Sequence, residues 1–135
     1  MTHYADVRED AVFSRALTVT DRLMEAFLSI SGDDNPLHTD EAFARAQGFQ
    51  GRVAYGNLIA LMISSLVGVE MKSLNVMLIS ETIAFRKPVY GGDTISLTAT
   101  VAAKIDAMQV AELKYQADNQ SGELVASGKI MVKFL

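Results

Sequence analysis

The run N57-L-I-A-L-M-I-S-S-L-V-G68 constrains the fold of this chain more than any other segment. Its apolar residues cover the whole circumference of a helix, and only Asn57, Ser64 and Ser65 interrupt them. A helix that is apolar on every side must be buried by other parts of the protein. We therefore predict a central helix over residues 57–68 that the rest of the chain wraps.

The second half of the chain has the residue pattern of β-strands. Ile95, Leu97, Ala99 and Val101 alternate with polar residues, so they share one face of a strand. Turn signals separate the strands, with Pro88 and two glycines in one turn and Asn-Gln-Ser-Gly in another. The predicted strands cover residues 75–85, 94–101, 108–116 and 123–134.

The first half of the chain is predicted to open with a strand over residues 11–19 and to continue with a helix. Thr18 or Thr20 can cap the start of this helix, and Gly32 is placed to end it in a left-handed conformation. The apolar spacing predicts one buried helix face. Its members are Leu23, Phe27 and Ile30.

Residues 33–38 are predicted to form a fixed, non-helical turn, because Pro36 is not tolerated inside a helix. A short second helix should follow, capped by Thr39 or Asp40 and closed by Gly48. The whole pattern is an antiparallel sheet around one long apolar central helix, which is the α+β hot-dog architecture. We expect one domain over residues 1–135, and a homodimer, because such a sheet has exposed edges that tend to pair.

Charge and composition exclude several classes of function. Twelve basic and sixteen acidic residues give a net charge of −4, so nucleic acid is not an expected partner. The chain has no cysteine and two histidines, which excludes disulfides and a thiol nucleophile and leaves little to bind a metal. The longest apolar stretch is shorter than the roughly 20 residues of a membrane span, and the N-terminus lacks a signal-peptide pattern. We expect a soluble cytoplasmic protein.

The segment S31-G-D-D-N-P-L-H38 places Asp33 five residues before His38. A carboxylate and an imidazole are the two groups most used for general acid–base catalysis. The same residues are also ordinary helix-end and turn residues. On residue type and spacing alone, a polar turn and a catalytic pair are both open interpretations.

Three blocks resemble the MaoC-like, or R-specific enoyl-CoA hydratase, family. They are S31-G-D-D-N-P-L-H-T-D40, A54-Y-G-N-L58 and F85-R-K-P-V-Y-G-G-D93. The similarity runs from about Thr20 to the C-terminus. The Asp-x-Asn-Pro-Leu-His motif is the specific part, because five residue types stand at fixed spacing.

The resemblance implies a dimeric hot-dog hydro-lyase of fatty acid metabolism. Its reaction would be the reversible addition of water to a trans-2-enoyl thioester, giving an R-3-hydroxyacyl thioester. The thioester would be an acyl-CoA or an acyl carrier protein conjugate, so coenzyme A is part of the substrate and no cofactor is implied. The residues carried over are Asp33 and His38 as the catalytic pair, Asn35 as their support, Gly56 as an oxyanion-hole donor and Ser64 as part of the acyl pocket.

The chain differs from the usual family pattern beside the predicted oxyanion hole. Tyr55 stands where the family usually has histidine, and Asn57 where it usually has methionine or a similar residue. Both become candidate substrate-binding residues that bear on the acyl chain accepted. Two alternative functions stay open: a hot-dog thioesterase, and a non-catalytic subunit that binds acyl thioesters.

Overall fold

The computed structural model describes residues 3–72 and 75–135. Its helices are α1 (Asp21–Ser31), α2 (Pro36–Thr39), α3 (Glu41–Ala46) and α4 (Leu58–Ser65), and a π-helical segment, Leu66–Glu70, extends α4. Its strands are β1 (Val12–Thr18), β2 (Val76–Glu81), β3 (Ala84–Phe85), β4 (Thr94–Ile105), β5 (Val110–Asp118) and β6 (Leu124–Phe134). Within the described residues, these strands form one six-stranded sheet in the order β1-β4-β5-β6-β2, with β3 also paired to β6.

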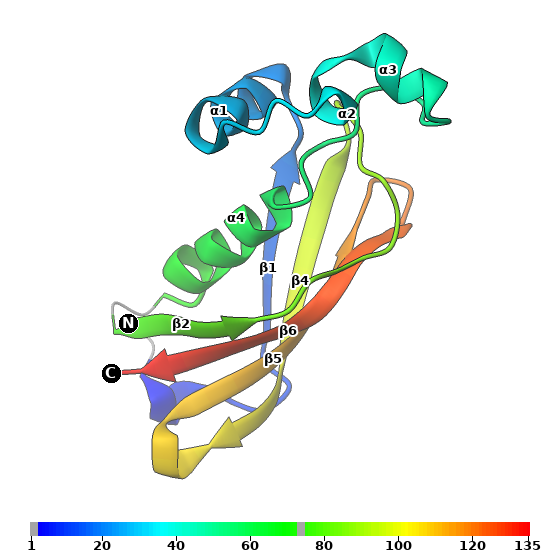
Figure 1. Ribbon diagram of the computed structural model, residues 1–135. Helices are drawn as coiled ribbons and strands as arrows, with labels where there is room; N and C mark the ends of the chain where they lie inside the picture. The colour runs from blue at the N-terminus through cyan, green and yellow to red at the C-terminus, as the bar shows by residue number, and fades with distance from the viewer. Residues whose placement is uncertain (1–2, 73–74) are drawn as a thin grey trace.

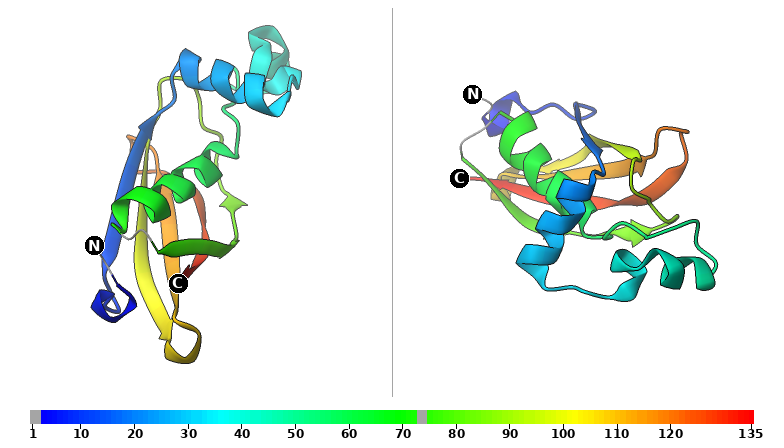
Figure 2. Two further views of the ribbon diagram at one scale, coloured as in Figure 1. Left: turned by 90° about the vertical axis from the view of Figure 1, so that its left-hand side faces the viewer. Right: turned by 90° about the horizontal axis from the view of Figure 1, so that it is seen from above.

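All strand pairs are antiparallel, and the sheet curves around α4 (Figure 1). Figure 2 shows α4 on one face of the sheet, with α1, α2 and α3 gathered beyond one end. This arrangement confirms the predicted α+β hot-dog fold. Within the described residues, no helix combines the length and apolarity that crossing a bilayer requires.

The core lies between α4 and the concave face of the sheet. Ile63 and Leu66 are fully buried, and they belong to one cluster with Leu97 of β4, Leu113 of β5 and Ile130 of β6. Burying each such side chain stabilises the fold by about 1.5–3 kcal/mol. The predicted alternation in β4 is confirmed, because the four apolar residues that were predicted to share a face are all buried. They are Ile95, Leu97, Ala99 and Val101.

The ends of α1 are confirmed, but its predicted buried face is partly wrong. Thr20 caps the helix by accepting a hydrogen bond from the Leu23 N–H at 3.1 Å, and Gly32 ends it with φ +68°. Ile30, however, is 80% exposed. The helix overhangs the end of the sheet (Figure 1), so its last turn has no apolar surface beneath it.

The prediction of a non-helical turn over residues 33–38 is confirmed for residues 33–35 and wrong for residues 36–38. Pro36 begins the short helix α2 instead of breaking one. At the first position of a helix, the missing N–H of proline has no intrahelical partner to lose. Asn35 completes this helix start, because its side chain accepts a hydrogen bond from the Leu37 N–H at 3.0 Å.

The predicted strand over residues 75–85 is interrupted. A bulge between Leu78 and Ser80 shifts the register against β6, and the strand then breaks into β2 and β3. The strand predicted over 94–101 is longer than expected and reaches Ile105.

The expectation that the central helix is buried on all sides is also wrong. Leu61 is 41% exposed, and Val69, in the π-helical extension, is 59% exposed. A curved sheet covers one side of a helix, and the opposite side of α4 faces outward in the single chain.

Candidate active site

The segment between α1 and α2 is held in shape by side chains that bond to nearby backbone groups. Ser31 Oγ accepts a hydrogen bond from the Asp33 N–H at 3.1 Å, and Asp33 Oδ1 accepts one from the Asn35 N–H at 3.2 Å. The Asn35 cap on α2 continues this series. Short polar side chains favour such local bonds, which give the backbone a defined turn without regular structure. Residues 32–35, between α1 and α2, are therefore a loop of defined shape.

Asp33 and His38 face each other across this loop. Asp33 Oδ2 lies 3.9 Å from His38 Nε2, which is too long for a direct hydrogen bond. The Asp33 side chain is 46% exposed, whereas that of His38 is 15% exposed. The pair is thus half open to solvent on the carboxylate side.

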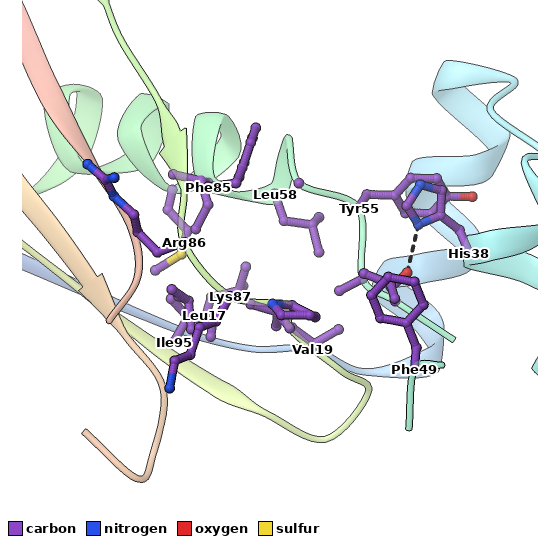
Figure 3. Close-up of a pocket in the computed structure, with 18 residues that line it drawn as sticks. Leu17, Val19, His38, Phe49, Tyr55, Leu58, Phe85, Arg86, Lys87 and Ile95 are labelled. Carbon is purple, nitrogen blue, oxygen red and sulfur yellow. Dashed lines mark hydrogen bonds between the residues drawn. The ribbon is translucent and has the colours of Figure 1, made fainter. Parts of the chain in front are cut away.

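The backbone of Val53 sets the tautomer of His38. His38 Nδ1 lies 2.7 Å from the Val53 carbonyl oxygen (Figure 3). A carbonyl oxygen can only accept, so Nδ1 carries the hydrogen in this bond. In a neutral imidazole, Nε2 is then an acceptor, and it is directed at the same space as the Asp33 carboxylate.

An apolar pocket of about 340 Å³ begins at His38. Figure 3 shows His38, Tyr55 and Phe49 at one end, and Arg86 and Lys87 at the other. The remaining lining side chains are almost all apolar and come from α4, from strands of the sheet and from the loops that adjoin them. They include Leu17, Val19, Leu58, Ile59, Met62, Phe85, Val89 and Ile95.

Gly56 also lines the pocket and stands just before α4. Its carbonyl accepts a hydrogen bond from the Ile59 N–H at 3.1 Å, so the chain is already turning into the helix. Among the described residues, no oxygen accepts a hydrogen bond from the Gly56 N–H. Free N–H groups and the helix dipole make such a position favourable for negative charge.

The ring of Phe85 packs directly on Gly56. A β-carbon built on Gly56 would lie 2.9 Å from Cε1 and Cζ of this ring. Phe85 is itself more than half exposed, so its ring has room to move. The absence of a side chain at position 56 therefore leaves space for the Phe85 ring and for a ligand in the pocket.

The structure brings only some of the predicted site residues to the pocket. His38, Tyr55 and Gly56 line the pocket. Asp33 is not a lining residue, but its carboxylate lies 3.9 Å from His38 Nε2. Asn35 is outside the lining, where it caps α2. Asn57 and Ser64 are exposed and outside the lining as well.

Sequence reasoning did not single out Phe49 and Phe85 as pocket residues, although both line the pocket. The sequence signal for Phe85 is its place as the first residue of F85-R-K-P-V-Y-G-G-D93, one of the three blocks that resemble the family. Phe49 follows Gly48 in a loop, and no pattern of spacing connects it with His38.

The antiparallel sheet curved around α4 defines the chain as a hot-dog protein, with an apolar pocket that begins at His38. Residues 4–121 match the family described as MaoC like domain, and the chain belongs to that family. It is 32% identical over 108 residues to an (R)-specific enoyl-CoA hydratase of Aeromonas caviae, covering 80% of this chain and 81% of the relative.

Two further relatives are of the same kind. A 3-hydroxybutyryl-CoA dehydratase of Methylorubrum extorquens is 35% identical over 107 residues, which cover 79% of this chain and 68% of the relative. The solved structure of the R-hydratase PhaJ1 from Pseudomonas aeruginosa superposes with a TM-score of 0.90 and 25% identity, covering 98% of this chain and 84% of that one. The predicted membership in a family of hydratase and dehydratase enzymes is confirmed.

Proposed function

We propose that this protein is an R-specific enoyl-CoA hydratase that adds water reversibly to a trans-2-enoyl thioester. The observation that carries the proposal is the acceptor pair of Asp33 Oδ2 and His38 Nε2, 3.9 Å apart, beside an apolar pocket that also contains Gly56. The family relatives support the same reaction. Coenzyme A enters as part of the substrate, so the proposal includes no separate cofactor.

In the proposed mechanism, one water molecule lies between Asp33 and His38. A water molecule has two hydrogens, and the two facing groups are both acceptors, so each takes one hydrogen bond. The oxygen lone pair is then free to attack the β-carbon of the enoyl group. As the C–O bond forms, one O–H bond of the water breaks and its proton passes to the pair, which delivers a proton to the α-carbon. A positioned acid–base pair contributes about 10²–10⁴ in rate.

The thioester oxygen gains negative charge during this attack. The free N–H of Gly56, at the start of α4, is the proposed donor that stabilises this charge. The acyl chain would occupy the apolar part of the pocket, between α4 and the sheet. Arg86 and Lys87, at the opposite end from His38, are already engaged with Ser127 and Glu123, and the mechanism assigns them no role.

The experiment that tests the proposal is to mix the protein with crotonyl-CoA. Hydration removes the absorbance of the conjugated thioester and leaves free thiol unchanged. Release of free thiol would instead support a thioesterase. Tight binding without either change would support a non-catalytic acyl-thioester-binding subunit, and a panel of longer enoyl thioesters, on coenzyme A and on acyl carrier protein, would define the preferred substrate.

Replacing Gly56 with alanine is expected to lower kcat by about 10²-fold, because the added methyl group displaces the thioester from the N–H donor. The free energy of unfolding should fall by no more than about 1 kcal/mol, since the exposed Phe85 ring can swing aside. Steady-state kinetics and thermal unfolding of the same sample measure both effects.

A double variant, Gly56→Ala with Phe85→Ala, separates the two explanations for this glycine. It removes the ring that the new methyl group would meet. Activity should stay low if the thioester needs the space. Recovery of activity would mean that Gly56 only accommodates Phe85.

We also propose that the protein is a homodimer that pairs through β2. This strand is one edge of the sheet and exposes Met77 and Ile79. The outward side of α4 and its extension exposes Leu61 and Val69. Edge strands with exposed apolar residues associate unless something covers them, and a second copy of the chain would cover both features together.

Light scattering should therefore give twice the mass of one 14.7-kDa chain. Ile79→Lys is expected to shift the protein toward monomer, because edge lysines oppose strand pairing. Val12→Lys, at an exposed position on the opposite edge strand β1, is the matched control and should stay dimeric. Loss of the dimer in Val12→Lys alone would locate the interface at β1 instead.

A further inference from the structure

Tyr55 makes contact with both members of the acid–base pair. Its hydroxyl donates a hydrogen bond to the backbone carbonyl of Asp33 at 2.7 Å. Its ring lies against the imidazole of His38, with centroids 4.3 Å apart and planes tilted by 31°. Figure 3 shows the two rings together at one end of the pocket.

The other contacts of Tyr55 hold its own ring in place. The ring stacks on Phe27 of α1, with centroids 4.5 Å apart and an interplanar angle of 26°. Only 4% of Tyr55 is exposed. Burial, together with the charges of Asp33 and Asp34, raises the pKa of Tyr55 above its ordinary value, so the phenol stays a neutral donor near pH 7.

The α2 end of this loop is joined to Val53, because the Leu37 carbonyl accepts a hydrogen bond from the Val53 N–H at 3.0 Å and His38 Nδ1 bonds to the Val53 carbonyl. Apart from Tyr55, the Asp33 end is fixed by the local bonds of Ser31, Asp33 and Asn35. These local bonds define the shape of the loop but not the position of Asp33 relative to the pocket. The Tyr55 hydroxyl joins Asp33 to the segment that leads into α4.

We propose that Tyr55 is a positioning residue that sets the separation of Asp33 and His38. The hydroxyl holds the Asp33 backbone, while the ring fixes one face of the imidazole whose Nδ1 is bonded to Val53. Tyr55 stands where the family usually has histidine, which suggested that it binds substrate. In this proposal, substrate binding is its secondary role. This inference rests on the proposed hydratase function, because it explains how the acceptor pair is held around one water molecule.

The test is Tyr55→Phe, which removes the hydroxyl and keeps the ring. In a crotonyl-CoA hydration assay, kcat should fall about tenfold, while KM changes less than twofold, because the pair is displaced and the acyl pocket is not. The amides of Asp33 and Asn35 should exchange faster with deuterium, since the Asp33 end of the loop has lost its bond to Tyr55.

Tyr115→Phe is the matched control. Tyr115 is equally buried, and its hydroxyl also donates to a backbone carbonyl, that of Thr82, at 2.7 Å. Tyr115 is not among the pocket residues. The two variants should lose similar thermal stability, but only Tyr55→Phe should lose turnover.

A double-mutant cycle distinguishes positioning from a general structural effect. If the hydroxyl acts through Asp33, adding Tyr55→Phe to Asp33→Asn should cost less than a further twofold in kcat. A full tenfold additional loss, or equal kcat in the Tyr55→Phe and Tyr115→Phe proteins, would overturn the inference. Absence of hydration by the wild-type protein would instead reject the proposed function itself.

Discussion

Asp33→Asn is expected to lower kcat for crotonyl-CoA hydration by about 10²–10⁴-fold, with the fold unchanged. Asparagine keeps the size of the side chain and the oxygen that accepts the Asn35 N–H, so the loop should keep its shape. It replaces the carboxylate oxygen 3.9 Å from His38 Nε2 with an amide NH2 group, which donates hydrogen bonds and cannot take a proton. Spectrophotometric kinetics and circular dichroism on the same preparation measure the two parts of this expectation.

His38→Ala should give a loss of the same order, because the water would then have one acceptor instead of two. Asp34→Asn is the matched control for Asp33→Asn, since Asp34 is the neighbouring exposed acid. It removes the same charge from the same loop and should leave kcat within about twofold. Near wild-type activity of Asp33→Asn, or an equal loss in Asp34→Asn, would contradict the assignment of the pair.

Gly128→Ala is expected to be more damaging than alanine at the other glycines of this chain, because its β-carbon would make the shortest contact. A β-carbon at position 128 would lie 1.9 Å from the carbonyl oxygen of Thr82 and 2.9 Å from the Tyr115 hydroxyl. The first of these contacts is with backbone, so no side-chain rotation relieves it. The free energy of unfolding should fall by about 3 kcal/mol or more, which corresponds to a decrease in Tm of about 10 °C.

The close approach at Gly128 is part of how the sheet is built. The Thr82 N–H and hydroxyl bond to the backbone of Lys129, and the Thr82 carbonyl accepts the Tyr115 hydroxyl. The bonds between Thr82 and Lys129 join β6 to the segment between β2 and β3. Displacing Thr82 would disturb all three bonds, and then the nearby strand β3, which carries Phe85 at the pocket.

Gly91→Ala is the control for this substitution. Gly91 lies in an exposed turn, and a β-carbon there would meet nothing within 4 Å. Its Tm should stay within about 2 °C of wild type, by the same size scaling. Equal Tm values for the Gly128→Ala and Gly91→Ala proteins would show that the segment around Thr82 can move aside without loss of stability.

The alternation of β4 and the caps of α1 could be predicted because they depend on neighbours in the chain. Ile95 and Leu97 are two residues apart and therefore share a face of any strand. Thr20 and Gly32 act on the backbone within a few residues of themselves. Pro36 was misread because its effect depends on which residue starts the helix, and one position decides between breaking and beginning it.

The candidate site was also predictable only where it depends on residues close together in the chain. The motif predicted that Asp33 and His38 act together, and the structure places their side chains facing each other. The tautomer of His38 was not accessible, because it depends on the carbonyl of Val53, fifteen residues away in sequence. The contact of Phe85 with Gly56, from strand β3, was equally hidden.

By itself, the sequence determined that an antiparallel sheet would pack around an apolar helix, and which residues of the strand over 94–101 would share the buried face. The spacing of apolar residues and the capping of a helix depend on residues close together in the chain, so they do not depend on how distant segments pack. Tertiary structure alone decided which side of α4 stays uncovered, that Tyr55 meets both Asp33 and His38, and that Gly128 needs to be glycine. Each of these depends on the distance between segments far apart in the chain, which only the folded structure defines.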